Sequence, residues 1–484
     1  MLRNCVLGVL VLGFSLQVYG QETAAALRAH VEYLASDALE GRGPGTDGKD
    51  LATVYIEQQF AQAGLQPFFN DSLVVPFVYG SAMARAKGYN VVGVLEGTDA
   101  SLRHEYVVLG AHYDHLGYRM VDGEKVIYNG ADDNASGTAT LIKLAQHYAK
   151  PGNRPARSLI FAAFDAEELG LHGSKDFVKR LSEEQKLQIG KMFSFDMVGM
   201  LTANDGLSLK GIASLRDGES TAKKIAARSG VNLQNMSKNI EQRTDTAPFG
   251  AVGIPAAHFF TGTKSPYHKP EDTAEKLDYA GMERVFDYST ALISELANAD
   301  VLRRTARMQR LAEGKLVDRW TLGLVANVGS SHHRYPDRFY HAKPAYSYGA
   351  GLRTNLKLTK HLALNVEALY HSDASRSEEG TYRRQSITVP ASIEIGLNNQ
   401  AEINLFLGVG AYYRFVQSGS DGDRDLDFDA YDNINDAGLQ ITLGWEVNRM
   451  RFGFESRYGL QSIYTNDVRV RSNEALFTIG YRFF

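Results

Sequence analysis

The chain has 484 residues, which is too long for one ordinary hydrophobic core, so we expect two or three domains. Its 52 Lys and Arg residues nearly balance 56 Asp and Glu residues, the formal net charge is −4, and the basic residues are dispersed. This charge pattern argues against nucleic acid as a partner. Cys5 is the only cysteine, which excludes disulfides and cysteine-rich metal sites from the rest of the chain.

The first twenty residues, MLRNCVLGVLVLGFSLQVYG, are typical of a secretory signal peptide. Arg3 supplies a positive charge, an apolar run follows, and Val18-Tyr19-Gly20 provides a small residue at a cleavage site. The alternative is a retained membrane anchor, but the apolar run is shorter than the ~20 residues that a helix needs to cross a bilayer. We therefore expect residues 1–20 to be a removable signal peptide.

Helical and apolar segments alternate between about residues 21 and 300. Residues 23–35 and 50–65 have the spacing of helices. Short apolar segments that end in polar residues lie at 89–97, 105–112, 158–168 and 192–199. Strands that alternate with helices predict an α/β domain, with a mostly parallel central sheet covered by helices on both faces. In such sheets ligands bind beyond the carboxyl ends of the strands, so we expect the functional site there.

A charged stretch at residues 301–316 predicts a helical linker, and the apolar pattern after it has a period of two. In AEINLFLGVGAYYRF (401–415), alternate residues from Ile403 to Phe415 are apolar. Eight segments of this kind lie at 320–328, 345–358, 362–370, 386–397, 401–415, 439–448, 452–460 and 474–484. Tight turns near 359–360, 398–399 and 448–449 alternate with long polar loops near 330–343, 372–382, 417–435 and 461–472. This arrangement is typical of an outer-membrane barrel.

The second face of these strands is charged. A soluble ligand-carrying barrel would direct its apolar face inward, whereas charged side chains cannot line a dry pocket but can pair inside a narrow, packed lumen. The charged positions are Arg353, Lys357, Glu367, Glu394, Arg414, Glu446, Glu455, Arg457 and Arg482. We therefore expect residues 317–484 to form an all-β, eight-stranded antiparallel transmembrane barrel in contact with outer-membrane lipid. An even strand number places both barrel ends on the short-turn side, so we expect residues 21–300 in the periplasm.

Five polar motifs in the first half contain side chains that bind metals. GAHYDHLG (110–117) has two histidines and an aspartate directly after an apolar run, and NGADDNASG (129–137) has two acids in a glycine-rich turn. FDAEELGLHGS (164–174) has adjacent glutamates, FSFDMVG (193–199) a lone aspartate, and SPYHKPEDT (265–273) a histidine. Nitrogen and carboxylate ligands without sulfur suit zinc in an open catalytic site, and manganese or cobalt would be tolerated.

Taken in this order and spacing, the motifs resemble the co-catalytic di-zinc aminopeptidases of metallopeptidase family 28. The resemblance runs from LASDALEGRGPGTDGKD to YHKPEDTAEKLDY, which is nearly the whole first half. It implies that two zinc ions bind, with His112 and Asp196 on one ion, Glu168 and His268 on the other, and Asp133 between them.

The same resemblance implies a mechanism and a substrate class. Two metal ions can polarise a scissile carbonyl and activate water, while Glu167 would act as general base and Asp114 would orient His112. The expected activity is that of a zinc-dependent metallopeptidase, an aminopeptidase that acts on peptides with a free N-terminus. The alternatives are a carboxypeptidase or another di-zinc amidohydrolase of the same fold, and a non-catalytic peptide-binding module with a surface-receptor barrel.

Other polar residues have simpler interpretations. We interpret Asp132 as a turn residue, His115 as structural or as a support for a ligand, and His172 as a solvated helix residue. His332 and His333 are expected to be exposed in an exterior barrel loop. The acidic stretch DGDRDLDFDAYD (421–432) favours a solvated loop, with a calcium site as the alternative.

One motif departs from the family pattern. Where many relatives have Ser-Asp-His before Pro-Phe, this chain has RTDTAPFG, with Thr246 in the histidine position. The five proposed ligands are unaffected. The departure instead concerns substrate contacts from this loop, including any role of Arg243 or Asp245.

Overall fold

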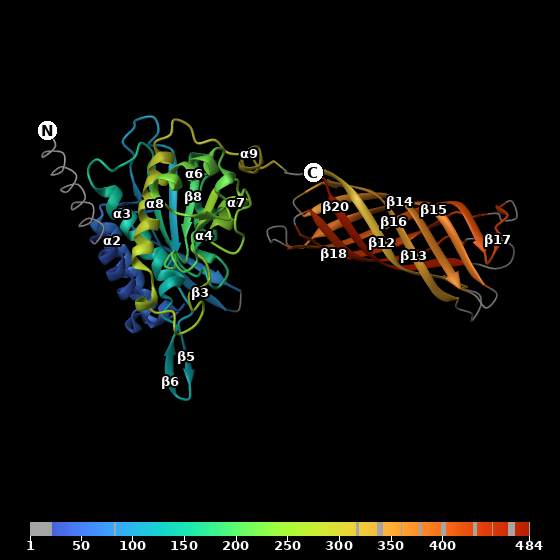
Figure 1. Ribbon diagram of the computed structural model, residues 1–484, viewed down its shortest axis with the longest axis horizontal. Coiled ribbons are helices and arrows are strands. Elements are labelled where there is room, and N and C mark those ends of the chain that lie inside the picture. The colour runs from blue at the N-terminus through green and yellow to red at the C-terminus, as the bar shows by residue number, and fades with distance from the viewer. Residues whose placement is uncertain are drawn as a thin grey trace, which may run out of the picture. The chain divides into compact units, whose positions relative to one another are not determined.

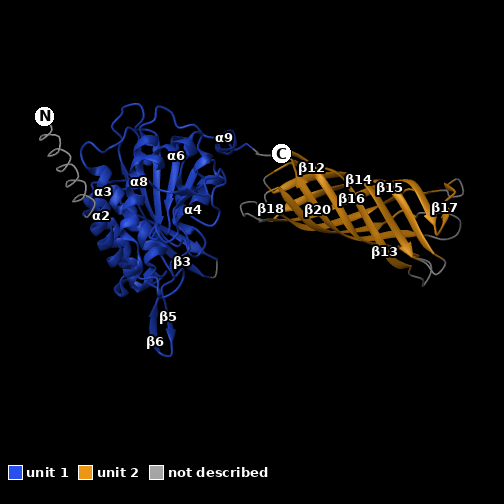
Figure 2. Cartoon of the chain, in the orientation of Figure 1, with its two compact units in different colours: residues 1–315 blue, residues 316–484 orange. Residues whose placement is uncertain are grey.

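The structure is a computed structural model. It describes residues 22–81, 84–315, 319–335, 342–359, 361–376, 380–397, 403–428, 433–447, 449–462 and 470–483. The chain divides into two compact units, Met1–Lys315 and Leu316–Phe484 (Figure 2). The expected signal peptide at 1–20 and the turn at 398–399 lie outside the described residues. None of the described helices is long and apolar enough to cross a membrane.

A mixed sheet lies at the centre of the first unit (Figure 1). Its strand order is β1-β3-β7-β4-β8-β11-β9-β10, with β2 paired to β3. The bounds are β1 Gln66–Pro67, β2 Val74–Gly80, β3 Arg85–Leu95, β4 Tyr106–His112, β7 Ser158–Phe164, β8 Ile189–Phe195, β9 Leu207–Lys210, β10 Leu233–Gln234 and β11 Ala256–Phe260. Strands β7, β4, β8 and β11 run parallel, whereas β3 and β9 join them antiparallel. The predicted α/β sheet with a parallel centre is confirmed, and its antiparallel flanks make it mixed.

Helices cover both faces of this sheet because the central strands are apolar on both sides. Leu109 of β4 packs in a core with the helix at residues 22–34 and with four further helices, while its neighbour Val108 packs with Phe177 and Phe249 on the opposite face. The first face carries α2 Asp47–Gln62, α3 Gly137–Ala149, α6 Gly218–Ser229 and α8 Tyr279–Ala297. The second carries α4 His172–Arg180, α7 Thr246–Ala251 and α9 Ala306–Ala312, and α5 Glu183–Gln188 leads into β8. Full burial of an apolar side chain such as Leu109 or Phe177 stabilises the fold by about 1.5–3 kcal/mol.

Short irregular segments connect the sheet to the site. They are η1 Asp37–Arg42, η2 Ala131–Ser136, η3 Ile212–Ser214 and η4 Ala274–Lys276. A two-stranded hairpin, β5 Tyr118–Val121 with β6 Glu124–Ile127, projects from the unit (Figure 1). The hairpin begins directly after the GAHYDHLG motif (110–117) and ends just before the NGADDNASG motif (129–137). The segments on either side of it therefore return to the same edge of the sheet.

In the described part of the second unit, eight long strands form a closed antiparallel barrel (Figure 1). They are β12 Trp320–Arg334, β13 Lys343–Lys357, β14 Leu362–Arg376, β15 Thr381–Gly396, β16 Ile403–Asp421, β18 Asp436–Val447, β19 Met450–Gly459 and β20 Arg471–Arg482, and a short β17 Arg424–Asp425 folds back on β16. Pairing of β12 with β20 and of β15 with β16 closes the ring. The eight-stranded antiparallel barrel predicted from the sequence is confirmed.

The orientation of the two barrel faces also follows the sequence pattern. On β16, Leu407, Val409 and Phe415 are exposed on the outer surface, whereas Arg414 is fully buried inside. Buried charged side chains pair across the lumen: Arg414 Nη2 lies 2.8 Å from Glu474 Oε2, and Arg457 Nη1 lies 3.3 Å from it. The lumen is therefore filled by paired side chains, as expected for a barrel of this size.

One prediction about the barrel is wrong. His332 and His333 were expected in an exposed exterior loop, but both belong to β12, and His333 is buried with its ring centroid 5.0 Å from that of Tyr382. Strand pairing with β20 continues to Arg334, so the sequence pattern ended the strand too early. By contrast, most of the described acidic stretch at 421–428 is exposed, as predicted.

Candidate metal centre

The five predicted ligands come from five separate segments at one edge of the sheet. His112 is the last residue of β4, Asp196 directly follows β8, and Asp133 lies in η2. Glu168 is in the loop after β7, and His268 is in the loop after β11. Because parallel strands end at the same edge of a sheet, these distant segments meet there.

The first group of ligand atoms consists of His112, Asp133 and Asp196. His112 Nε2 lies 3.4 Å from Asp133 Oδ1 and 3.4 Å from Asp196 Oδ1. All three side chains are buried. One imidazole nitrogen and two carboxylate oxygens thus converge on one point, which is a donor set that suits a divalent cation.

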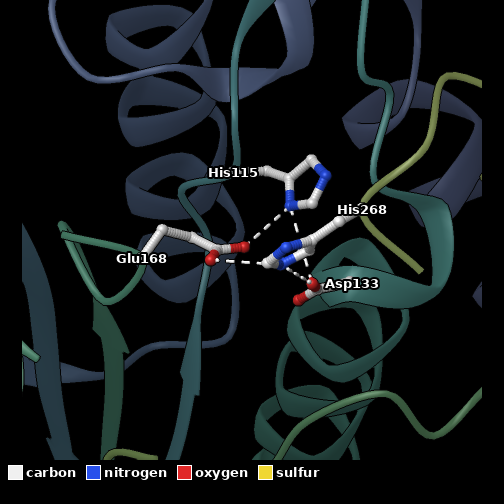
Figure 3. A group of neighbouring side chains, drawn as sticks. All are labelled: His115, Asp133, Glu168 and His268. Atoms are coloured by element: carbon white, nitrogen blue, oxygen red, sulfur yellow. Dashed lines mark hydrogen bonds and ion pairs between the residues drawn. The ribbon is translucent and has the colours of Figure 1, made fainter. Parts of the chain in front are cut away.

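The second group contains His115, Asp133, Glu168 and His268 (Figure 3). His268 Nε2 lies 3.1 Å from Asp133 Oδ2 and 3.3 Å from Glu168 Oε2. Asp133 therefore presents one oxygen to each group. This arrangement is compatible with the bridging role that the family resemblance implies for Asp133.

His115 lies closer to the site than the sequence analysis required. Its Nδ1 is 3.0 Å from Glu168 Oε1 and 3.8 Å from Asp133 Oδ2 (Figure 3). Burial lowers its pKa to about 3, so the ring is neutral at physiological pH. A neutral imidazole can donate a hydrogen bond to the Glu168 carboxylate, or its free nitrogen lone pair can bind a metal ion, so His115 supports the second group directly.

Asp114 contacts His112 mainly through its backbone. The backbone carbonyl of Asp114, 3.2 Å away, accepts from His112 Nδ1, whereas the carboxylate is 3.8 Å from that nitrogen. The carboxylate accepts instead from the backbone N–H groups of Glu167 at 3.0 Å and Glu168 at 3.3 Å. Asp114 therefore orients His112 through its backbone, and its side chain fixes the loop that carries the two glutamates.

Glu167 belongs to neither group, and it lies close enough to the first group to interact electrostatically with His112 and Asp196. Burial raises the pKa of Glu167 well above its ordinary value, with Asp245, Asp196 and Asp114 adding to the rise and His112 opposing it. A carboxyl group whose proton affinity is raised in this way is suited to accept a proton.

Two further residues at the site carried a weak signal in the sequence. His258 interrupts the apolar strand β11, and its Nε2 lies 3.4 Å from Asp196 Oδ2. Tyr267 stacks its ring on His268, with centroids 3.8 Å apart. A histidine inside an apolar strand was the available signal for His258. For Tyr267 the signal was its place next to a proposed ligand.

The remaining polar residues named in the sequence analysis lie around the centre. Asp132 is buried and belongs to neither group, and its Oδ1 accepts from the backbone N–H of Gly199. The hydroxyl of Thr246 donates to the backbone carbonyl of Glu241, 2.9 Å away, so it closes its own loop. His172 is partly exposed and stacks on Tyr79.

The two neighbours of Thr246 in the sequence motif differ from each other. The Arg243 side chain is 84% exposed. Asp245 is buried, and burial raises its pKa to about 6. Of the two, only Asp245 is close enough to the first group for its charge to act on His112 and Asp196.

The charge balance of the centre fits a bound cation. Among the described residues, no lysine or arginine forms an ion pair with Asp133, Glu168 or Asp196, and their partners are histidines. Buried carboxylates that form no ion pair with a lysine or arginine are costly, and a divalent ion supplies the missing positive charge. The donor set has imidazole and carboxylate groups and no sulfur, which fits zinc.

Comparison with known proteins gives a family and several relatives. Residues 90–293 match the family model described as "Peptidase family M28". Aminopeptidase YwaD of Bacillus subtilis is 28% identical over 243 residues, or 48% of this chain and 50% of that protein. Leupeptin-inactivating enzyme 1 of Streptomyces exfoliatus is 27% identical over 366 residues, or 72% of this chain and 75% of that protein. An aminopeptidase from Aneurinibacillus sp. strain AM-1 has a TM-score of 0.48 and 19% identity, with 59% of this chain and 97% of that chain covered.

The alignment spans only half of the Bacillus protein's length. The matched family segment contains all five predicted ligands and both predicted catalytic residues. Residues 90–293 of the first unit therefore match a peptidase family M28 domain, and a closed eight-stranded antiparallel barrel follows the first unit.

Proposed function

We propose that this protein is a metal-dependent exopeptidase, an aminopeptidase that holds two zinc ions in the centre described above. The observation that carries the proposal is that Asp133 presents its two oxygens to two groups of ligand atoms. His112 and Asp196 would hold one ion, and Glu168 and His268 the other. Manganese or cobalt would fit the same donors.

The chain supplies positioned groups for peptide hydrolysis. When bound, a pair of such ions provides Lewis acidity toward a carbonyl oxygen and toward water. Glu167 would accept the proton of the attacking water and return it to the leaving amine, because its carboxyl group lies close to His112 and Asp196 of the first group. Asp114 holds the backbone of Glu167 in place, and His112, Asp133 and Asp196 of the first group are buried.

Peptides with a free N-terminus are the proposed substrates. The relatives named above include an aminopeptidase. A carboxypeptidase or another amidohydrolase with the same metals is the second candidate, and substrate chemistry separates the two.

The test uses the full-length protein in detergent, loaded with zinc. One dipeptide is assayed with its α-amine free and with its α-amine acetylated, each with and without a chelator. We expect chelator-sensitive hydrolysis of the free-amine form alone. Hydrolysis of both forms would contradict the aminopeptidase assignment while retaining the metal site, and a zinc-loaded protein that cleaves neither form would contradict the enzyme assignment.

We further propose that the barrel anchors the peptidase domain to the outer membrane and that this domain lies in the periplasm. The support is the distribution of side chains: apolar residues such as Leu407 and Val409 face outward, and charged ones such as Arg414 and Glu474 pair inside. A barrel wall of this kind suits lipid outside and a packed lumen inside.

Protease accessibility tests the placement. Protease added to intact cells should leave the peptidase domain whole, and it should cleave that domain once the outer membrane is permeabilised. Loss of the domain from intact cells would contradict the periplasmic placement. Recovery of the protein in the soluble fraction would contradict the anchor.

A further inference from the structure

Arg42 is a fully buried arginine that binds backbone carbonyls on both sides of the metal centre. Its Nε donates to the carbonyl of Tyr113 at 2.7 Å, between the ligand His112 and Asp114. Its Nη1 and Nη2 donate to the carbonyls of Asn129 and Gly130, each at 2.8 Å. One guanidinium thus joins the segment that carries His112 to the segment that leads to Asp133.

The backbone of Arg42 adds to the same connection. Its carbonyl accepts from the backbone N–H of His115 at 3.3 Å, and the neighbouring Gly41 accepts from the N–H of Gly117 at 3.2 Å. Burial lowers the pKa of Arg42 to about 10, so the side chain remains positively charged at neutral pH. Its charge therefore also offsets part of the negative charge of the centre.

Asp272 holds the bridging segment from its other end. Its carboxylate accepts from the backbone N–H of Asp132 at 3.0 Å and from that of Asp133 at 3.1 Å. Its own carbonyl accepts from the N–H of Ala131 at 3.1 Å. Asp272 is fully buried and lies four residues after the ligand His268, so it joins the His268 loop to the same segment.

We propose that Arg42 and Asp272 are positioning residues that together set the distance between the two metal sites. A buried cation binds the carbonyls at residues 129 and 130, and a buried anion binds the N–H groups at residues 132 and 133. Arg42 also binds the segment that carries the ligand His112, and Asp272 belongs to the loop that carries the ligand His268. Asp133 is thereby fixed relative to His112 on one side and His268 on the other, before any metal binds.

The physical argument is preorganisation. A bridging carboxylate serves two ions only if both oxygens stay within a few tenths of an ångström of their places, and residues behind the ligands supply this constraint. Arg42 suits the task because its planar guanidinium donates several hydrogen bonds at fixed angles, which a lysine ammonium does not reproduce. Neither residue contacts the ligand atoms of the two groups, so each acts through the backbone.

The inference rests on the proposed metal centre, and its test measures metal binding directly. Full-length wild type, R42K, R42Q and D272N are titrated with Zn²⁺ against a chelating dye, and with Co²⁺ to record the visible spectrum. R157Q is the matched control, because Arg157 is also fully buried and also binds carbonyls, those of Ala299 and Asp300 among them, away from the metal centre. Thermal unfolding of the chelated proteins shows that each variant is folded.

We expect R42Q and D272N to weaken metal binding by about 10–100-fold and to change the Co²⁺ spectrum. R42K should lose less metal affinity than R42Q, because it retains the positive charge. It should still lose some affinity, because it lacks the several donors of the planar guanidinium. R157Q should lose thermal stability but bind both ions as the wild type does. Folded R42K and D272N with wild-type affinities and spectra would overturn the inference, even if R42Q failed to fold. A wild-type protein that binds no metal would instead contradict the proposed function.

Discussion

Both units of this protein bury acidic side chains, and they surround them with different partners. In the barrel, Asp373 lies 2.8 Å from Arg384 and 3.2 Å from Arg414, and Glu474 contacts Arg414, Arg457 and His371. The barrel acids are thus compensated by arginines within the same wall of strands. These ion pairs stabilise the packed lumen, and the paired carboxylates do not form a site for an added metal ion.

The metal centre uses the same residue types without that compensation. Asp133, Glu168 and Asp196 have histidine partners, and among the described residues no arginine or lysine forms an ion pair with them. The nearest buried arginine, Arg42, binds backbone carbonyls instead. The comparison shows that the partner of a buried carboxylate, more than its burial, separates a structural charge from a binding site.

The largest effect is expected from Asp133→Asn, which removes the shared ligand. Both metal ions should be lost, and hydrolysis should fall below detection. The metal-free variant should nevertheless be more resistant to thermal unfolding than the metal-free wild type, because one of several mutually repelling acids is gone. Metal analysis and melting curves in chelator check this. A variant that retains two tightly bound ions would contradict the shared-ligand role.

Glu167→Gln should lower kcat/KM by about 10²–10⁴-fold, the usual contribution of a general base. Metal content should stay at the wild-type value, because Glu167 belongs to neither ligand group. Steady-state kinetics together with metal analysis separate loss of the base from loss of the ions. A decrease of less than tenfold would remove Glu167 from the mechanism.

Glu474→Gln makes the equivalent acid-to-amide change in the barrel, and the sign of its effect on stability should be opposite to that of Asp133→Asn. Loss of this carboxylate leaves Arg414 and Arg457 without one of their partners, which should destabilise the barrel by about 3–5 kcal/mol. Unfolding in detergent, followed by gel mobility, measures the change. Dipeptide hydrolysis should be unaffected, because the substitution is in the barrel. Unchanged unfolding stability would show that the ion pairs in the lumen do not stabilise the barrel.

The smallest effect is expected from Val409→Lys on the outer wall of β16. If lipid surrounds this surface, a lysine near the middle of the strand should cost about 2–4 kcal/mol, and Gln417→Lys near the end of the same strand only about 0–1 kcal/mol. Folding into lipid vesicles at increasing urea concentration compares the two. Equal costs would indicate that water surrounds both positions.

Much of the fold was predictable from apolar periodicity. The alternation of Leu407 and Val409 with Gly408 and Gly410 predicted which barrel face is outward, and the apolar runs before His112 and Asp196 predicted the central strands. Strand ends were less predictable. His333 continues a strand into a polar stretch, because pairing with β20 outlasts the hydrophobic pattern.

The supports of the metal centre were harder to predict than the ligands. The ligands follow from recognisable motifs, whereas Arg42 and Asp272 bind backbone atoms of segments that are distant in the sequence. No side-chain pattern encodes such a contact. The same reason explains Asp114, whose carboxylate binds the N–H groups of the glutamate loop while its carbonyl accepts from His112.

The central claim is that the carboxylates without a lysine or arginine ion-pair partner hold a pair of metal ions bridged by Asp133. Anomalous X-ray diffraction at the zinc edge, on crystals of the zinc-loaded full-length protein, tests it most directly. We predict two peaks, one between His112, Asp133 and Asp196 and one between Asp133, Glu168 and His268. Zinc-loaded crystals with no peak at either position, or with one peak that does not contact Asp133, would contradict the account.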